Sequence, residues 1–359
     1  MKKHNFSAGP CILPKEVLQQ ASESVINFNN DNLSLIEISH RSKPFVDVME
    51  KARGLVRELL NIPKNYSILF LQGGASLEFL MAPYNLLTIN GKCGYINTGV
   101  WSEKAIKEAK NLGETLIIGD SSDKNFNYIP KNINIPTDLD YLHYTSNNTI
   151  YGTQFKSSPE TNNILVCDMS SDIFSQKIDV NKFGLIYAGA QKNMGPAGTT
   201  LVIINNDILG KTGRNIPTML DYSVHINKDS MFNTPPVFSI YVSMLTLEWL
   251  KNTGGVEEIE KINKNKAKML YEEIDRNSLF KGFANDDDRS IMNVTFNLVE
   301  NNLQEQFDLL CTKNGINGLK GHRSVGGYRA SMYNALPISS VNYLIELMQK
   351  FEKKIWLKY

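Results

Sequence analysis

Between residues 66 and 206, short apolar segments alternate with longer segments that have a helical pattern. Ile68–Leu71 and Ile164–Val166 are typical of buried strands, and a helix is expected over residues 75–87. Because parallel strands need such crossovers, the alternation predicts an α/β fold with a mainly parallel sheet that helices cover on both faces. In open sheets of this kind, ligands bind at the carboxyl ends of the strands.

The chain of 359 residues is longer than one hydrophobic core usually serves. A helical pattern that ends near Leu250 is followed by Asn252-Thr253-Gly254-Gly255, a strong helix stop. After this stop the pattern predicts a helix, a strand and a second helix, over residues 256–271, 291–298 and 303–311. We expect a large domain over residues 16–255 and a smaller α+β domain from residues 1–15 and 256–359.

A formal net charge of +1 argues against nucleic acid or an anionic membrane as a partner. The four cysteines are far apart and have no nearby histidines, so we expect neither a metal site nor a disulfide framework: Cys11, Cys93, Cys167 and Cys311. The basic N-terminus lacks the apolar stretch of a secretory signal, and no segment has the length and apolarity of a membrane helix. We therefore expect a cytoplasmic protein.

Lys192 lies in the glycine-rich segment Tyr187–Gly198, between two apolar segments that are typical of core strands, residues 185–187 and 199–204. A solvated loop lysine is the ordinary interpretation of such a residue. However, a lysine that is buried among small residues loses hydration, so its pKa falls and the free amine can attack a carbonyl. Lys192 is therefore a candidate nucleophile.

Asp168 follows the apolar segment Ile164–Cys167, at the carboxyl end of a predicted core strand. A carboxylate in this position could cap a helix or bind a metal. Paired with Lys192 across one crossover, it instead suggests pyridoxal 5′-phosphate (PLP), because a lysine must hold the cofactor aldehyde and an acid must keep the ring nitrogen protonated.

Gly73-Gly74-Ala75-Ser76 lies between a predicted strand and a predicted helix, where backbone N–H groups can bind a phosphate. A plain strand-to-helix turn is the alternative. Trp101 follows another predicted strand end and could stack on an aromatic ring, although core packing would explain it equally well.

Two histidine-arginine pairs occur in a chain with only five histidines, namely His40-Arg41 and His322-Arg323, and Arg329 follows the second pair. Either pair alone would most simply form surface salt bridges. Together their settings at strand ends and beside glycines suggest a substrate with two anionic groups, a carboxylate and a phosphate.

Several segments in order along the chain resemble the phosphoserine aminotransferase family of class V PLP-dependent aminotransferases: Phe6–Pro10, Glu37–Arg41, Tyr187–Gly198, Asn233–Pro236 and Gly321–Ala335. The resemblance covers essentially the whole chain. It implies the aspartate-aminotransferase-like architecture of PLP-dependent enzymes, called fold type I, with a large domain around a mainly parallel mixed sheet and a smaller C-terminal α+β domain. It also implies a homodimer with active sites at the subunit interface.

The resemblance implies that Lys192 holds PLP as a Schiff base, that Asp168 contacts the pyridine nitrogen and that Trp101 stacks on the ring. Thr149 would hydrogen-bond the 3-oxygen. The cofactor phosphate would be bound by Ala75, Ser76, Gln191 and, from the neighbouring subunit, Asn233 and Thr234.

For the substrate, the resemblance implies that Arg329 binds the α-carboxylate. The distal phosphate, or the side-chain carboxylate of glutamate, would be bound by His40, Arg41, His322 and Arg323. Ser76 and Glu78 depart from the family, since some members carry arginine in place of Ser76 and glutamine is common in place of Glu78. The resemblance therefore implies backbone contacts to the cofactor phosphate at this turn and does not extend to these two side chains.

The resemblance implies reversible amino transfer from L-glutamate to 3-phosphohydroxypyruvate, giving O-phospho-L-serine and 2-oxoglutarate in serine biosynthesis. A phosphate ester of vitamin B6 biosynthesis, converted to 4-phosphohydroxy-L-threonine, is a second possible substrate. The rivals are an alanine–glyoxylate-type aminotransferase, a cysteine desulfurase and a phosphate-binding module without chemistry.

Overall fold

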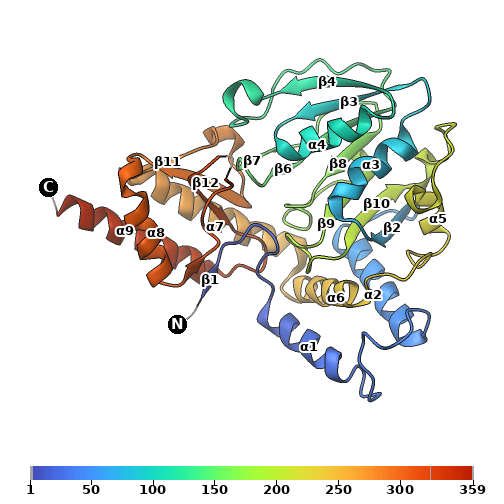
Figure 1. Cartoon of the computed structure of the whole chain (residues 1–359), viewed down its shortest axis with the longest axis horizontal. Coiled ribbons are helices and arrows are strands. Elements are labelled where there is room, and N and C mark those ends of the chain that lie inside the picture. The colour runs from blue at the N-terminus through green and yellow to red at the C-terminus, as the bar shows by residue number, and fades with distance from the viewer. Residues whose placement is uncertain (1–2, 324, 358–359) are drawn as a thin grey trace.

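The computed structural model describes residues 3–323 and 325–357; the remaining residues of the expected small domain, 1–2, 324 and 358–359, lie outside this part. A seven-stranded sheet forms the larger part of the molecule, and a smaller part lies to its left in Figure 1. The strand order is β2-β10-β9-β8-β5-β3-β4. These strands are β2 (Tyr66–Leu71), β3 (Lys92–Asn97), β4 (Glu114–Asp120), β5 (Tyr141–Thr145), β8 (Leu165–Asp168), β9 (Leu185–Gly189) and β10 (Thr200–Asn205).

β10 runs antiparallel to both of its neighbours, β2 and β9, whereas the other pairs are parallel. The predicted α/β fold with a mainly parallel mixed sheet is therefore confirmed. Because β2 and β9 are both antiparallel to β10, they run in the same direction and end at the same edge of the sheet.

The apolar strands are explained by burial on both faces of the sheet. Leu201 and Ile203 of β10 belong to the hydrophobic core on one face, and Val202 and Ile204 belong to the core on the other face. The first face is covered by α1 (Lys15–Ile26), α2 (Lys43–Leu59) and α6 (Val237–Asn252), and the second by α3 (Gly74–Leu86), α4 (Val100–Ala109) and α5 (Tyr222–Ile226).

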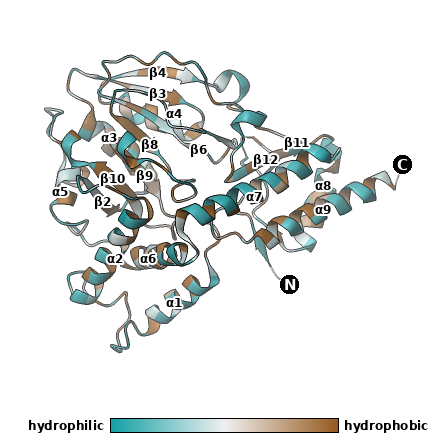
Figure 2. Ribbon diagram, turned by 180° about the vertical axis from the view of Figure 1, so that it is seen from behind, coloured by the Kyte–Doolittle hydropathy of each residue, from teal (hydrophilic) through white to brown (hydrophobic). Residues whose placement is uncertain are grey.

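The smaller part has an antiparallel sheet in the order β11-β12-β14 and a separate hydrophobic core. Its elements are β11 (Phe280–Gly282), β12 (Asn293–Leu298), β14 (Tyr328–Ser331), α7 (Gly255–Arg276), α8 (Gln304–Lys313) and α9 (Ile338–Trp356). Helices α7 and α9 carry hydrophilic and hydrophobic residues along their length, as expected for helices that cover one face of a sheet (Figure 2). Phe6, from the other end of the chain, joins this core.

Short elements complete the fold. β1 (His4–Asn5) pairs with β13 (Ile316–Asn317), and β6 (Asn147–Asn148) forms a hairpin with β7 (Thr153–Gln154). The 3-10 helices span Ser122–Lys124, Val180–Lys182, Asn206–Ile208, Thr218–Leu220, Asp286–Asp288 and Asn301–Leu303.

A fully buried lysine of α7 holds the loop that follows β14. Lys266 donates hydrogen bonds to the carbonyl oxygens of Met332, Tyr333 and Leu336, at 3.0, 2.9 and 3.2 Å. The backbone N–H of Asn334, in the same loop, donates to Asn193 Oδ1 at 2.9 Å. The loop after β14 is therefore attached to the residue that follows Lys192.

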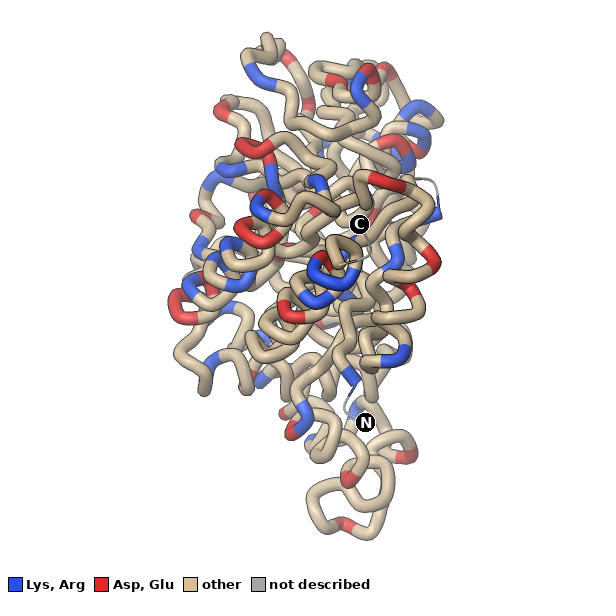
Figure 3. Tube along the Cα trace, turned by 90° about the vertical axis from the view of Figure 1, so that its left-hand side faces the viewer, with Lys and Arg blue, Asp and Glu red and all other residues tan. Residues whose placement is uncertain are grey.

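Basic and acidic residues are interspersed over the side of the molecule shown in Figure 3. No helix in residues 3–323 and 325–357 is both long and apolar enough to cross a membrane.

Candidate active site

Lys192 lies on the loop between β9 and β10, as the sequence predicted. Its half-buried side chain donates a hydrogen bond from Nζ to Thr149 Oγ1 at 2.7 Å. The same Nζ lies 5.1 Å from the centroid of the Trp101 ring. Two residues that sequence analysis connected with the lysine therefore lie beside its amine.

Burial lowers the pKa of Lys192 to about 8, because the loss of hydration disfavours the ammonium form. The negative charge of Asp168 counteracts this shift, and the positive charge of Arg329 adds to it. Part of the Lys192 population therefore has a free amine near neutral pH, which is the form that attacks a carbonyl carbon.

Asp168 is the last residue of β8 and is only 4% exposed. Its Oδ1 accepts a hydrogen bond from the backbone N–H of Ser170 at 2.9 Å. Burial raises the pKa of Asp168, while the charge of Lys192 and the bonds from Ser170 favour the ionised form. No group of three or more His, Cys, Asp and Glu residues in the described chain is arranged to hold a metal ion.

The first turn of α3 carries Ala75 and Ser76 at the carboxyl end of β2. Gly73 and Gly74 have φ angles of 92° and 66°, which side chains other than glycine rarely adopt. The N–H groups of a first helical turn have no partner within the helix, and the helix dipole favours an anion there. The predicted phosphate site therefore lies at the same sheet edge as Lys192.

Trp101 is in the first turn of α4, and its half-buried ring packs against two hydrophobic clusters. Its Nε1 is buried and has no hydrogen-bond partner in the described chain. Lys104 Nζ lies 4.6 Å from the ring centroid. Core packing thus accounts for part of the Trp101 environment and leaves an unused donor.

Arg329, on β14 of the smaller part of the molecule, contacts Thr149, which is also the partner of Lys192. Its Nη1 donates to the carbonyl oxygen of Thr149 at 3.2 Å, while its buried Nε has no partner in the described residues. Burial lowers the pKa of His322, and the positive charges of Arg329, Arg323 and Lys104 lower it further. The cations predicted to bind substrate from residues 322–329 therefore lie close to one another.

Some of the predicted site residues do not contact Lys192 within a single chain. Within the described residues, no hydrogen bond or ion pair joins His40 or Arg41 to the lysine, and His40 Nε2 is buried without a partner. The side chain of Gln72 donates to the carbonyl oxygen of Thr234 at 2.7 Å, which places Thr234 and its neighbour Asn233 near the end of β2. Gln191 follows β9, and its carbonyl oxygen accepts from the Cys11 N–H at 3.0 Å.

A second buried carboxylate, Asp172, lies in the loop after Asp168 and was not among the predicted site residues. Ser146, Gln154 and Lys104 were not predicted to have a role either. A signal for Asp172 existed, because the polar residues Ser170-Ser171-Asp172 directly follow an apolar strand.

Comparison with known proteins decides the family. The family model of class-V aminotransferases matches residues 3–344. The chain is 64% identical over 356 residues to the phosphoserine aminotransferase of Flavobacterium psychrophilum, covering 99% of this chain and 100% of the relative. The chain belongs to the phosphoserine aminotransferase family. The predicted family is therefore confirmed.

Two solved structures confirm fold type I. A phosphoserine aminotransferase described with a Schiff base has a TM-score of 0.95 at 50% identity and covers 99% of this chain and 100% of its own. A PLP-bound phosphoserine aminotransferase from Trichomonas vaginalis has a TM-score of 0.92 at 36% identity, covering 97% of this chain and 100% of its own. The prediction of a PLP-dependent aminotransferase is confirmed as well.

The residues around Lys192 fit this cofactor. The buried Nε1 of Trp101 and Nε of Arg329 are unused donors, and the amine of Lys192 has a lowered pKa. A buried carboxylate, Asp168, is suited to a cationic ring nitrogen, and the first turn of α3 is suited to a phosphate.

The lowered pKa of Lys192 predicts how its reactivity depends on pH. In the cofactor-free protein, reductive methylation of Lys192 by formaldehyde and a borohydride-type hydride donor should increase with a midpoint near pH 8, because only the free amine reacts. Asp168→Asn should lower this midpoint, since the carboxylate favours the ammonium form. Peptide mass spectrometry across pH 6–11, in steps of roughly half a unit, measures both midpoints.

The exposed residue Asp207 provides the control, and Asp207→Asn should leave the midpoint unchanged. A wild-type midpoint near the usual lysine value of about 10.4, or an unchanged midpoint in Asp168→Asn, would contradict this electrostatic account.

Proposed function

We propose that the protein catalyses the reversible transfer of the amino group from L-glutamate to 3-phosphohydroxypyruvate, which gives O-phospho-L-serine and 2-oxoglutarate. The observation that carries this proposal is the group of cations around His322, namely Arg329, Arg323 and Lys104, of which Arg329 lies at the Thr149 carbonyl beside Lys192. Such a group suits a substrate with a carboxylate and a phosphate. The 64% identity to a phosphoserine aminotransferase over essentially the whole chain supports the same reaction.

PLP, when bound, supplies an aldehyde and an electron-accepting ring. Lys192 would hold the aldehyde and later use its amine to take the proton from the substrate α-carbon. Asp168 would keep a proton on the ring nitrogen. Thr149 Oγ1, now 2.7 Å from Lys192 Nζ, would donate to the 3-oxygen when the lysine moves.

The remaining cofactor contacts are proposed from the positions of their elements. Trp101 would cover one face of the ring, because its ring centroid lies 5.1 Å from Lys192 Nζ and its indole packs against the core on its other contacts. The amides of Ala75 and Ser76 would bind the phosphate, aided by Gln191 and by Asn233 and Thr234 of the partner subunit.

The two anionic groups of the substrate would be bound by different residues. Arg329 would bind the α-carboxylate, because its guanidinium already lies at the Thr149 carbonyl beside Lys192. His322 and Arg323 would bind the distal phosphate or the glutamate side chain, together with His40 and Arg41.

We further propose a homodimer whose active sites lie at the subunit interface. The segment from α1 to α2 projects from the body of the molecule (Figure 1) and exposes Leu18, Ile26, Leu33 and Ile36 at 51, 81, 51 and 58%. Apolar exposure of this extent is typical of a surface that another chain covers. The same segment leads to His40 and Arg41, which no described contact joins to Lys192.

Three further predictions remain proposals. The two domains, residues 16–255 and residues 1–15 with 256–359, are supported by the two separate cores and by Phe6 in the second core. A cytoplasmic location is supported by the four free cysteines. Use of the vitamin B6 precursor would rely on the same phosphate-binding cations.

Arg323→Ala tests the proposed substrate. The wild type should use phosphoserine far better than serine as amino donor to 2-oxoglutarate. Removing one charge-assisted contact, worth about 1.5–3 kcal/mol, should lower kcat/KM for phosphoserine roughly ten- to hundredfold and leave the value for serine almost unchanged. Steady-state kinetics with both donors measure the effect.

Lys320→Ala is the matched control, because Lys320 is an exposed cation in the segment between β13 and β14, to which Arg323 also belongs. Its Nζ forms an ion pair with Asp308 Oδ2 at 2.8 Å. This variant should keep kcat/KM for phosphoserine within about twofold of the wild type. Equal use of serine and phosphoserine by the wild type would refute the assignment.

Heterodimers test whether two chains share each site. A Lys192→Ala chain combined with an Arg41→Ala chain should show about half of wild-type activity per dimer, because one of the two sites would have an intact lysine and the partner subunit's Arg41. The dimer can be purified with two different affinity tags.

The reciprocal heterodimer is the control. A chain with both substitutions combined with a wild-type chain should be inactive if Arg41 acts across the interface. Half activity in this heterodimer, with none in the first, would show that each chain uses its own Arg41.

A further inference from the structure

Asp172 is a second buried carboxylate close to Asp168, with 6% of its surface exposed. Its hydrogen-bond partners are neutral side chains rather than cations. Ser146 Oγ donates to Asp172 Oδ1 at 2.5 Å, and Gln154 Nε2 donates to Asp172 Oδ2 at 3.2 Å. Burying a carboxylate without a cationic partner costs free energy, and its two hydrogen bonds offset part of this cost.

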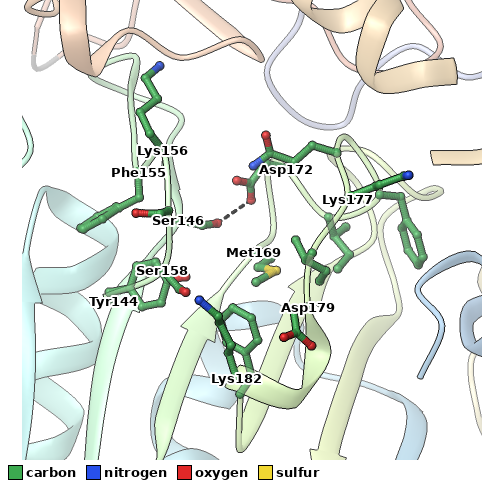
Figure 4. Close-up of a pocket in the computed structure, with 16 residues that line it drawn as sticks. Tyr144, Ser146, Phe155, Lys156, Ser158, Met169, Asp172, Lys177, Asp179 and Lys182 are labelled. Carbon is green, nitrogen blue, oxygen red and sulfur yellow. Dashed lines mark hydrogen bonds between the residues drawn. The ribbon is translucent and has the colours of Figure 1, made fainter. Parts of the chain in front are cut away.

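The two partners of Asp172 stand at the base of the β6–β7 hairpin. Ser146 directly precedes β6, Gln154 ends β7, and the backbone N–H of Phe155 donates to the carbonyl oxygen of Ser146 at 2.9 Å. Asp172 therefore holds both strands of the hairpin, one with each carboxylate oxygen. Figure 4 shows the Ser146–Asp172 bond in this position.

The turn of the same hairpin carries Thr149, which contacts two residues of the proposed reaction. Its Oγ1 accepts from Lys192 Nζ, and its carbonyl oxygen accepts from Arg329 Nη1. A shift of the hairpin base would displace this turn and both contacts.

The hairpin base is also joined to Asp168 and to the smaller part of the molecule. Ser146 Oγ lies 3.1 Å from the carbonyl oxygen of Asp168, and Gln154 Oε1 accepts from the backbone N–H of Ile291 at 3.0 Å. The buried residue Asn147 donates to Asn293 Oδ1 of β12 at 2.7 Å. These bonds form a continuous buried network from β8 to β12.

A cavity lies next to Asp172 at the hairpin base. Asp172, Ser146 and Phe155 line a cavity of about 200 Å³, whose other lining residues include the exposed Asp179 (Figure 4). Beside this cavity, the hydrogen bonds of Asp172 and the packing of Phe155 on Tyr144, with ring centroids 4.9 Å apart, together hold the hairpin base.

We propose that Asp172 is a positioning residue, which fixes the β6–β7 hairpin so that Thr149 presents its hydroxyl to Lys192 and its carbonyl to Arg329. This inference rests on the proposed function for its effect on turnover. Its effect on the hairpin is independent of any substrate.

A double-variant cycle tests the proposal. Asp172→Asn leaves one acceptor oxygen for the two donors Ser146 Oγ and Gln154 Nε2, and Gln154→Glu alone places two carboxylates opposite each other. Each single variant should lower kcat roughly tenfold and should speed amide hydrogen exchange in residues 147–154 of the cofactor-free protein. The combined variant restores a donor and an acceptor, so kcat should recover to within about threefold of the wild type.

Asp179→Asn is the control, because Asp179 lines the same cavity but contacts neither strand of the hairpin. If Asp172→Asn does not fold, Gln154→Met removes the second bond and serves in its place. The proposal is overturned if the single variants keep wild-type kcat and exchange, or if the combined variant is no better than either. A wild type that does not transaminate phosphoserine would instead refute the proposed function, whereas the exchange data would still test the hairpin.

Discussion

The proposed reaction depends on an environment that disfavours the ammonium form of one lysine, Lys192. The β9–β10 connection places Lys192 where burial lowers its pKa to about 8, and Asp168 limits that shift. The sheet makes this arrangement possible because β2, β8 and β9 end at one edge, where their side chains and the first turn of α3 meet. A buried lysine alone would not suffice, since the proposed reaction also needs an acid, an anion site and substrate cations.

The two hydrophobic cores explain why the site draws on distant parts of the sequence. Lys192, Asp168 and Thr149 belong to the part with the large sheet, whereas Arg329 stands on the small sheet and reaches the Thr149 carbonyl. Buried polar bonds join the two parts, and Lys266 fixes the loop whose Asn334 contacts Asn193. These bonds are directional, so they hold the two parts in one arrangement more specifically than apolar packing does.

Much of the fold was predictable because β2, β8, β9 and β10 are buried on both faces and therefore appear as apolar segments of ordinary strand length. The antiparallel direction of β10 was not, since pairing direction leaves no pattern in a strand buried on both faces. Asp168 and Lys192 were predictable as candidates from their positions at strand ends. The Arg329–Thr149 contact and the role of Asp172 were not, because both depend on bonds between segments far apart in sequence. The roles proposed for His40 and Arg41 come from the resemblance alone, because the structure of one chain does not connect these residues with Lys192.

Peptide mapping after borohydride reduction of the PLP-bound protein shows which lysine holds the cofactor. A second buried lysine, Lys266, makes the measurement discriminating, because burial lowers its pKa to about 7 as well. We expect one pyridoxyl group per chain, on Lys192, since Lys266 is fully buried and its amine donates to three carbonyl oxygens. A pyridoxyl group on Lys266 or another lysine, with Lys192 unmodified, would contradict the role proposed for Lys192.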